Sequence, residues 1–174
     1  MDGDQLRALQ APIKAKYRDD PASARVTLSA RGTLASGSLT CRVETAGGPI
    51  EAGLHPATGG DGRGACSGAM LLEALVACAG VTLRAVATVM GISVQGGSVM
   101  AEADWDARGT LGVDREAPVG MSAVRLRFEL DSDASEEQLA TLLKLTERYC
   151  VVEQTLKNPP RISAEIVSKE ASDR

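Results

Sequence analysis

Aromatic residues are scarce in this chain of 174 residues, where they make up only 2% of the sequence. Proteins that bind single-stranded nucleic acids commonly stack the bases on aromatic rings, so this scarcity argues against a nucleic-acid partner. The net charge of −4 argues the same way, because binding to phosphates needs a basic surface. Since 44% of the residues are apolar, the chain is expected to form a core, and that core must be aliphatic.

The N-terminus has no apolar run of the kind that forms a signal peptide. The longest apolar stretch, residues 69–90, approaches the length of a membrane span, but Glu73 and Arg84 interrupt it. We therefore expect a buried helix in a soluble, cytoplasmic protein with no membrane partner. Cysteines in the cytoplasm are reduced, so the four cysteines of this chain are not expected to form structural disulfides.

Histidine is nearly absent, because His55 is the single one in the chain. Zinc sites usually contain closely spaced ligand pairs, and no two cysteines here lie within four residues of each other. A serine hydrolase needs a histidine base, but the sequence has no G-x-S-x-G motif. The glycines of residues 59–64 lack the Lys-Ser/Thr ending of a phosphate-binding loop. The sequence therefore predicts no metal ion and no cofactor.

The first 22 residues are predicted to form a helical arm, with Asp4 as its cap and Pro12 as a kink. Residues 23–174 are predicted to form one domain. Within it, apolar and polar residues alternate with the period of a half-buried strand. The expected strands are residues 26–30, 39–43, 50–54, 93–95 with 99–105, 121–130 and 161–167.

Two long helices separate these strands. A glycine-rich loop over residues 55–68 is expected to lead into an apolar helix over residues 69–90. A second helix is expected to begin at Ser135, because Ser135 and Gln138 have the spacing of a capping box. A further helical turn is expected to follow at Cys150. This order of strands and helices predicts an α+β fold with a long buried central helix.

The four cysteines are the strongest nucleophiles in the sequence. Cys41 lies in phase with the apolar residues of its strand, which predicts a small buried hydrophobe. Cys66 directly precedes the central helix and is a candidate secondary thiol. For Cys78, inside that helix, the pattern alone favours an inert packed residue. Cys150 begins a helical turn, where N–H donors favour a thiolate and Arg148 is nearby in sequence.

Two cysteine-containing segments show a recognisable pattern. In the first, Gly59-Gly60-Asp61-Gly62 leads into the apolar helix Met70–Arg84, which contains Ala77-Cys78. In the second, Glu147-Arg-Tyr-Cys150-Val-Val-Glu places a cysteine after a short amphipathic helix. By these marks, roughly residues 25–167 resemble the OsmC/Ohr family, which comprises osmotically inducible protein C-like and organic hydroperoxide resistance proteins.

The resemblance implies an intertwined homodimer, in which antiparallel sheets surround the central helices. It implies a thiol-dependent peroxidase that reduces organic hydroperoxides, with Cys78 as the peroxidatic and Cys150 as the resolving thiol. An external dithiol, from a lipoyl protein or a thioredoxin-like protein, would restore both thiols. In relatives, an arginine paired with a helix-start glutamate stabilises the thiolate. Arg31 is the best-placed arginine and Arg42 the runner-up, but Gly68 stands at the glutamate position.

Two other functions stay open at this stage. The missing glutamate favours a non-catalytic dimer of the same fold, which binds an apolar ligand or senses redox state. A structural interaction domain with inert, buried cysteines is the third hypothesis. Rapid titration of the thiols in the native protein would argue against this third hypothesis, because packed structural cysteines react slowly.

Overall fold

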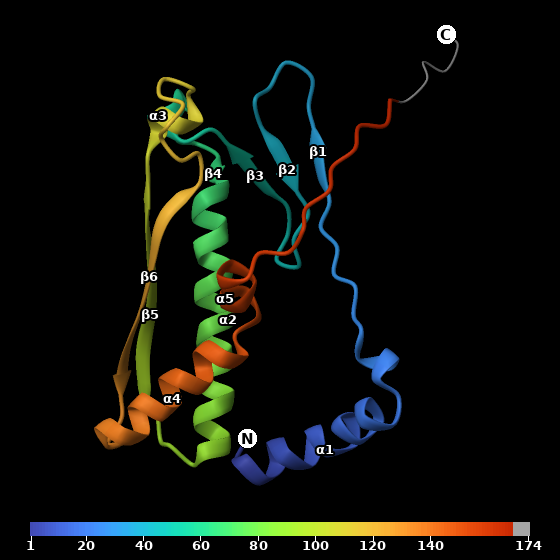
Figure 1. Cartoon of the computed structure of the whole chain (residues 1–174), viewed down its shortest axis with the longest axis vertical. Coiled ribbons are helices and arrows are strands. Elements are labelled where there is room, and N and C mark those ends of the chain that lie inside the picture. The colour runs from blue at the N-terminus through green and yellow to red at the C-terminus, as the bar shows by residue number, and fades with distance from the viewer. Residues whose placement is uncertain (169–174) are drawn as a thin grey trace.

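The computed structural model describes residues 1–168 of the chain. At its centre lies the 24-residue helix α2 (Ser67–Met90), which ends at Gly91 with a φ of +71°. A left-handed residue of this kind is a common helix terminator, and glycine adopts it without strain. A ribbon of two antiparallel strands, β5 (Gly96–Trp105) and β6 (Met121–Asp131), runs along one side of α2 (Figure 1).

Helix α2 buries one of its sides. The residues of α2 that are at most 3% exposed are Leu75, Ala79, Leu83 and Ala87. Because they recur every four residues, they lie on one side of the helix. Leu142, from α4 (Glu136–Tyr149), covers the C-terminal half of this side, and Cys150 covers the N-terminal half. On the opposite side Val81 is 72% exposed, so a single chain does not bury the helix completely.

Among residues 1–168, α2 is the one helix that is long and apolar enough to cross a membrane, with a mean hydropathy of 1.8. The core helices of soluble proteins meet the same criterion of length and composition. Since α2 packs against the β5–β6 ribbon and against α4 and α5 (Val151–Lys157), the apolar residues on its buried side belong to the core that these elements form.

A second sheet lies beside the N-terminal end of α2 (Figure 1). Its strands, in spatial order, are β1 (Gly32–Leu34), β2 (Cys41–Val43), β3 (Ile50–Gly53) and β4 (Ala65–Cys66). The first three pair antiparallel, and β4 adds a two-residue parallel pairing to β3. The α+β class predicted from the sequence is confirmed, with this short parallel pairing as the exception to the expected antiparallel sheets.

Two expected strands are absent from the described chain. Residues 26–30 and 161–167 form no strand, although their apolar and polar residues alternate as predicted. A strand needs a neighbour to accept and donate its backbone hydrogen bonds, and these segments have no neighbour within residues 1–168. Their large apolar residues are therefore solvent-exposed, namely Val26 at 74%, Leu28 at 87%, Ile162 at 90% and Ile166 at 99%.

The expected N-terminal helix is present as α1 (Gly3–Asp19), and Pro12 lies inside it without ending it. Its cap is Asp2 rather than Asp4, because the Asp2 carboxylate accepts a hydrogen bond from the backbone of the first turn. The start of α1 packs on the end of α2, where the Arg7 guanidinium donates to the Val89 carbonyl at 3.1 Å. The division of the chain at residue 22 stays a prediction. Short 3₁₀ helices follow at Pro21–Ala24 and Pro56–Thr58.

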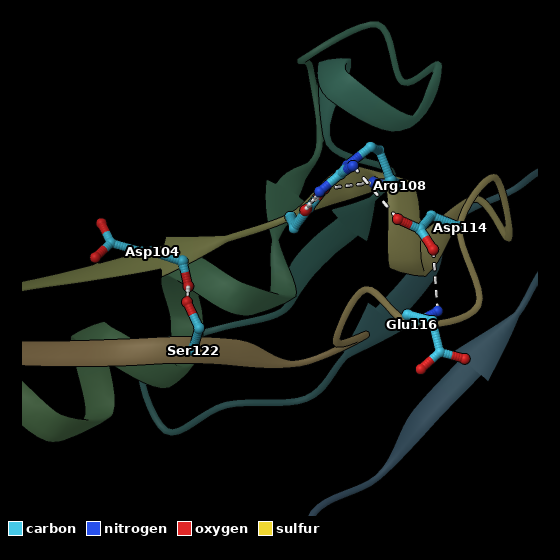
Figure 2. Close-up of polar contacts among 6 residues, drawn as sticks. Asp104, Arg108, Asp114, Glu116 and Ser122 are labelled. Carbon is cyan, nitrogen blue, oxygen red and sulfur yellow. Dashed lines mark hydrogen bonds and ion pairs between the residues drawn. The ribbon is translucent and has the colours of Figure 1, made fainter.

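The connection between β5 and β6 contains the short helix α3 (Ala107–Thr110). Asp106 caps α3 by accepting a hydrogen bond from the Arg108 N–H at 3.0 Å. The Arg108 side chain then pairs with Asp106 at 2.6 Å and with Asp114 at 3.4 Å (Figure 2). These ion pairs close the loop on itself at the end of the ribbon. Both partners of each pair remain accessible to water, so the pairs contribute little to stability.

Candidate functional site

Two cysteines far apart in the sequence meet at the middle of the central helix. Cys78 lies in α2, and Cys150 lies at the junction between α4 and α5 (Val151–Lys157), which both pack on α2 (Figure 1). Both are free thiols, and Cys78 packs against the buried cluster that contains Cys150. The structure therefore contains a reduced pair of cysteines in direct contact.

The position of Cys150 follows from the way two helices join. Cys150 has extended backbone angles, φ −71° and ψ 108°, so it ends α4 and begins α5. Its N–H donates to the Thr146 carbonyl at 2.9 Å, and its carbonyl accepts from the Gln154 N–H at 2.9 Å. Thr146 is itself fully buried, and its hydroxyl donates to the Leu142 carbonyl. The backbone at Cys150 is thus fixed on both sides, and its side chain points inward.

The surroundings of the pair are apolar. Cys150 is 0% exposed, and Cys78 is half-buried. The apolar neighbours of the two thiols are Leu75, Ala79, Val99, Ala101, Leu126, Phe128 and Val152. These side chains come from α2, from both strands of the ribbon and from α5. The environment of the pair is therefore mostly aliphatic, with Phe128 as an aromatic neighbour.

The pKa of Cys78 lies below that of an ordinary cysteine. Burial acts to raise it, but hydrogen-bond donors outweigh this effect. The donors are, in order, the backbone N–H of Val152, the thiol of Cys150, the backbone N–H of Val151 and the hydroxyl of Thr82. Donors stabilise a thiolate, which is the nucleophilic form of cysteine. Cys78 is therefore more reactive than the inert packed residue that the sequence pattern alone favoured.

The pKa of Cys150 is shifted the other way. Burial raises it most, and the hydrogen bond to Cys78 and the negative charges of Cys78 and Glu153 raise it further, against a lowering by the Glu153 N–H. The sequence suggested instead that Cys150 would be the thiolate at the start of its helical turn. That prediction was wrong, because the N–H groups of Val151 and Val152 point at Cys78. The two shifts therefore favour the thiolate at Cys78 over the thiolate at Cys150.

The arginines expected beside the thiolate lie elsewhere in a single chain. Arg31 is exposed, just before β1, and its carbonyl accepts from the Glu44 N–H at 3.0 Å. Arg42 is exposed too, and it pairs with Glu44 at 4.0 Å. Within residues 1–168 no cation contributes to the low pKa of Cys78. A role for Arg31 as the support of the thiolate therefore stays a prediction, as does the choice between Arg31 and Arg42. Arg148 lies over the Tyr149 ring.

A side chain at position 68 would require Met121 to move. A Cβ atom added to Gly68 would lie 3.2 Å from the Met121 methyl and 3.7 Å from the Cys66 sulfur. The Met121 side chain thus occupies the space into which a longer residue would extend. Glu73, further along the helix, is exposed.

The remaining candidates have structural roles. Cys41 is half-buried and packs directly on Gly32, which leaves no space for a side chain there. Cys66 is half-buried at the start of α2. The His55 ring accepts from the Ala57 N–H at 3.0 Å and so shapes the turn that follows it. In the part of the chain that the structure describes, no cluster of histidine, cysteine and acidic residues is arranged to hold a metal ion.

Surface cavities lie away from the two thiols. One of about 540 Å³ is formed by β2, β3 and the glycine-rich loop, and another of about 550 Å³ lies on α4 and α5. Neither is lined by Cys78 or Cys150. Within a single chain, the two thiols are therefore packed among apolar side chains and line neither cavity.

Sequence reasoning missed two residues of this site. Thr82 follows Cys78 by one helical turn and donates to its sulfur. Glu153 follows Cys150 by three residues and is only 9% exposed. The signal was the spacing, since residues three or four apart on a helix share a side. Glu153 in particular is an acidic residue on the buried side of a helix, where an apolar residue is usual.

The fold and the site together define a class: small α+β proteins in which a cysteine of a central helix contacts a second cysteine from a C-terminal helical turn. The family model of the OsmC-like proteins matches residues 60–165 of this chain. The chain therefore belongs to the OsmC-like family, which confirms the resemblance found in the sequence. No curated protein matches the sequence of the chain.

Solved structures show the same fold at low sequence identity. An OsmC-like protein from Mycoplasma pneumoniae has a TM-score of 0.64 and 19% identity, covering 77% of this chain and 89% of its own. A protein from Legionella pneumophila, described as an organic hydroperoxide resistance protein OsmC, has a TM-score of 0.61 and 18% identity, covering 77% and 93%. An organic hydroperoxide resistance protein from Elizabethkingia anophelis has a TM-score of 0.55 and 14% identity, covering 78% and 92%.

Proposed function

We propose that this protein is a thiol-dependent peroxidase that reduces organic hydroperoxides, with Cys78 as the peroxidatic cysteine and Cys150 as the resolving cysteine. One observation carries the proposal. Cys78 and Cys150 pack in one apolar cluster, and nearby donors, the thiol of Cys150 among them, lower the pKa of Cys78. The nucleophile and the thiol that would trap its oxidised form are therefore already in contact. Family membership adds support, because some structural neighbours are described as organic hydroperoxide resistance proteins.

The chemistry runs in three steps. The Cys78 thiolate attacks the terminal oxygen of the hydroperoxide, so that an S–O bond forms, the O–O bond breaks and the alkoxide leaves as the alcohol after taking a proton. Cys150 then attacks the Cys78 sulfenic acid, which gives a disulfide and water. An external dithiol of the lipoyl or thioredoxin-like kind reduces this disulfide by exchange and is itself oxidised. This cycle suits a reducing compartment such as the cytoplasm.

The apolar surroundings favour an organic substrate over hydrogen peroxide. Leu75 and Val99 belong to the aliphatic cluster around the thiol pair. An alkyl group that packs against such side chains gains about 0.8 kcal/mol for each buried CH₂. Hydrogen peroxide has no such group and gains nothing from them.

The active unit is proposed to be a homodimer. Residues 26–30 and 161–167 have the alternation of strands but no neighbour in the described chain, and the side of α2 around Val81 is exposed. A second copy of the chain would cover these surfaces, and it is the proposed source of an arginine near Cys78. Sedimentation velocity at micromolar concentration is expected to show twice the 18.1 kDa mass of one chain. A single species at the mass of one chain would contradict the dimer.

One observation favours a second function, a dimer that senses redox state or binds an apolar ligand without turnover. Gly68 stands where the helix-start glutamate would lie, and no cation of the described chain lowers the pKa of Cys78. The two functions differ in rate. A peroxidase consumes many equivalents of t-butyl hydroperoxide when dithiothreitol is present, whereas a sensor oxidises slowly and without sustained consumption.

Mass spectrometry tests the proposal directly. One equivalent of t-butyl hydroperoxide, added to the reduced protein, is expected to remove two hydrogens per chain, because the thiols of Cys78 and Cys150 join. Peptide mapping without reduction should then recover one cross-linked pair of peptides that contains both cysteines. A stable sulfenic or sulfinic acid on Cys78 with no cross-link would contradict the role of Cys150. An unchanged mass would contradict the proposal as a whole.

A further inference from the structure

Glu153 is a buried carboxylate beside the thiol pair. Glu153 lies in the first turn of α5 and is 9% exposed. It is one of two buried polar residues in the described chain. One of its oxygens, Oε1, pairs with the Lys157 ammonium at 2.7 Å. The other, Oε2, is fully enclosed and has no hydrogen-bond partner among residues 1–168.

An ion pair alone does not explain this arrangement. A typical surface pair leaves both partners in water and needs no burial. Here the Lys157 side chain is half exposed, whereas the Glu153 side chain is largely buried. Of the two carboxylate oxygens of Glu153, only Oε1 has a partner. Burying a carboxylate oxygen without a partner is unfavourable, and such atoms are rare in folded proteins. An apolar residue at this position would pack among Val152 and its neighbours without that penalty.

The enclosed carboxylate belongs to the helical turn that Cys150 begins. Its negative charge raises the pKa of Cys150. The residues are three apart in one helical turn, so they share a side of α5. The titratable groups around Glu153 are Cys78 from α2, Glu147 from α4, and Cys150 with Lys157 from its own segment.

We propose that the carboxylate of Glu153 accepts the proton of the Cys150 thiol when that sulfur attacks an oxidised Cys78. The proposal rests on the peroxidase function and assigns a residue to its resolving step. A thiolate beside a carboxylate is repelled by it, so Cys150 keeps its proton in the resting protein. Transfer of that proton to the carboxylate removes the negative charge and frees the sulfur lone pair at the moment of attack.

The atoms of this step balance. The sulfur of Cys150 forms a bond to the sulfur of Cys78, the S–O bond of the sulfenic acid breaks, and the proton of Cys150 passes to Glu153. The departing hydroxide then takes this proton and leaves as water, and Glu153 returns to the carboxylate. The sulfur of Cys150 is oxidised and the sulfenic sulfur of Cys78 is reduced by the same amount, so the step needs no external oxidant or reductant.

The variant Glu153→Gln tests this role, because glutamine has nearly the same shape but cannot act as the base. We expect the sulfenic acid at Cys78, trapped with dimedone in a single turnover, to form within about threefold of the wild-type rate, and disulfide formation to slow by about 100-fold. Glu147→Gln is the matched control, because Glu147 also contacts Lys157, at 3.5 Å, but lies outside the thiol pair. It should resolve at the wild-type rate.

The pH profile of disulfide formation separates a base from a merely structural residue. The wild-type rate should change by less than about threefold between pH 6 and pH 8, whereas the Gln variant should rise about tenfold per pH unit, because it depends on the thiolate of Cys150. A Glu153→Asp variant should keep the flat profile at a lower rate. If Glu153→Gln fails to fold, the wild-type profile still decides, since a steep wild-type rise overturns the proposal.

Failure of this inference can be told apart from failure of the peroxidase function. A wild-type protein that forms no sulfenic acid at Cys78 overturns both. If the wild-type protein forms the sulfenic acid and the disulfide, and the Glu153→Gln variant forms the disulfide as fast, only the role of Glu153 is overturned.

Discussion

Replacing Cys78 with serine is expected to lower the kcat/KM for t-butyl hydroperoxide by at least about 1,000-fold. The serine hydroxyl is close to the thiol in size, so packing against Leu75 and Ala79 on the same helix is retained. At neutral pH, however, the hydroxyl does not ionise, and the donors on the Cys78 sulfur would have no thiolate to stabilise. Peroxide loss is measured in the presence of dithiothreitol, with the rate of the reductant alone subtracted.

Cys66→Ser is the matched control for this experiment. Cys66 is a half-buried free thiol at the start of the same helix, where no donor set of this kind is found. Its replacement should leave kcat/KM within about twofold of the wild-type value. Peroxide consumption by Cys78→Ser at the wild-type rate would show that another group carries out the reaction, and it would remove the mechanism proposed above.

Alkylation of the native protein should distinguish the two thiols by at least about tenfold at pH 7. Only the thiolate reacts with iodoacetamide. The pKa of Cys78 is lowered, so its thiolate persists at pH values where an ordinary cysteine is already protonated. The pKa of Cys150 is raised, so its thiol stays protonated at pH values where an ordinary cysteine ionises. The full burial of Cys150 slows its alkylation further. Cys78 is therefore expected to be labelled first.

The measurement is peptide mapping by mass spectrometry after short exposure to iodoacetamide between pH 5 and pH 9. Free glutathione, labelled under the same conditions, gives the profile of an unperturbed thiol. The rate at Cys78 should reach its plateau at a lower pH than the glutathione rate. A Cys150→Ala variant, which removes one donor, should move that plateau to higher pH. Labelling of both cysteines at equal rates would contradict the asymmetry of the pair.

Local signals predicted the elements that a single chain can complete. The capping box of Ser135 and Gln138 is present at the start of α4, and the alternation over residues 121–130 forms β6. The same alternation failed for residues 26–30 and 161–167, because alternation states which side chains prefer burial but not which chain supplies the neighbouring strand.

The pairing of the two cysteines was predictable from the resemblance, but the electrostatics around them were not. The resemblance pointed to Cys78 and Cys150, and the structure brings them into contact. Sequence position alone assigned the helix-start donors to Cys150. A thiol that begins a helical turn receives those N–H groups only if its side chain folds back over them, and Cys150 instead points into the core. The orientation of one side chain therefore reverses which sulfur has the lowered pKa.

The segment that follows α4 supplies three things to one sulfur atom: a second thiol from Cys150 and two backbone N–H groups from Val151 and Val152. Activation of Cys78 and capture of its oxidised form consequently share a single covalent unit. One residue inserted directly after Cys150 would turn α5 by about 100° and remove both N–H groups together. Evolution can therefore vary the identity of side chains here, but not the length of the chain, without losing both halves of the chemistry at once.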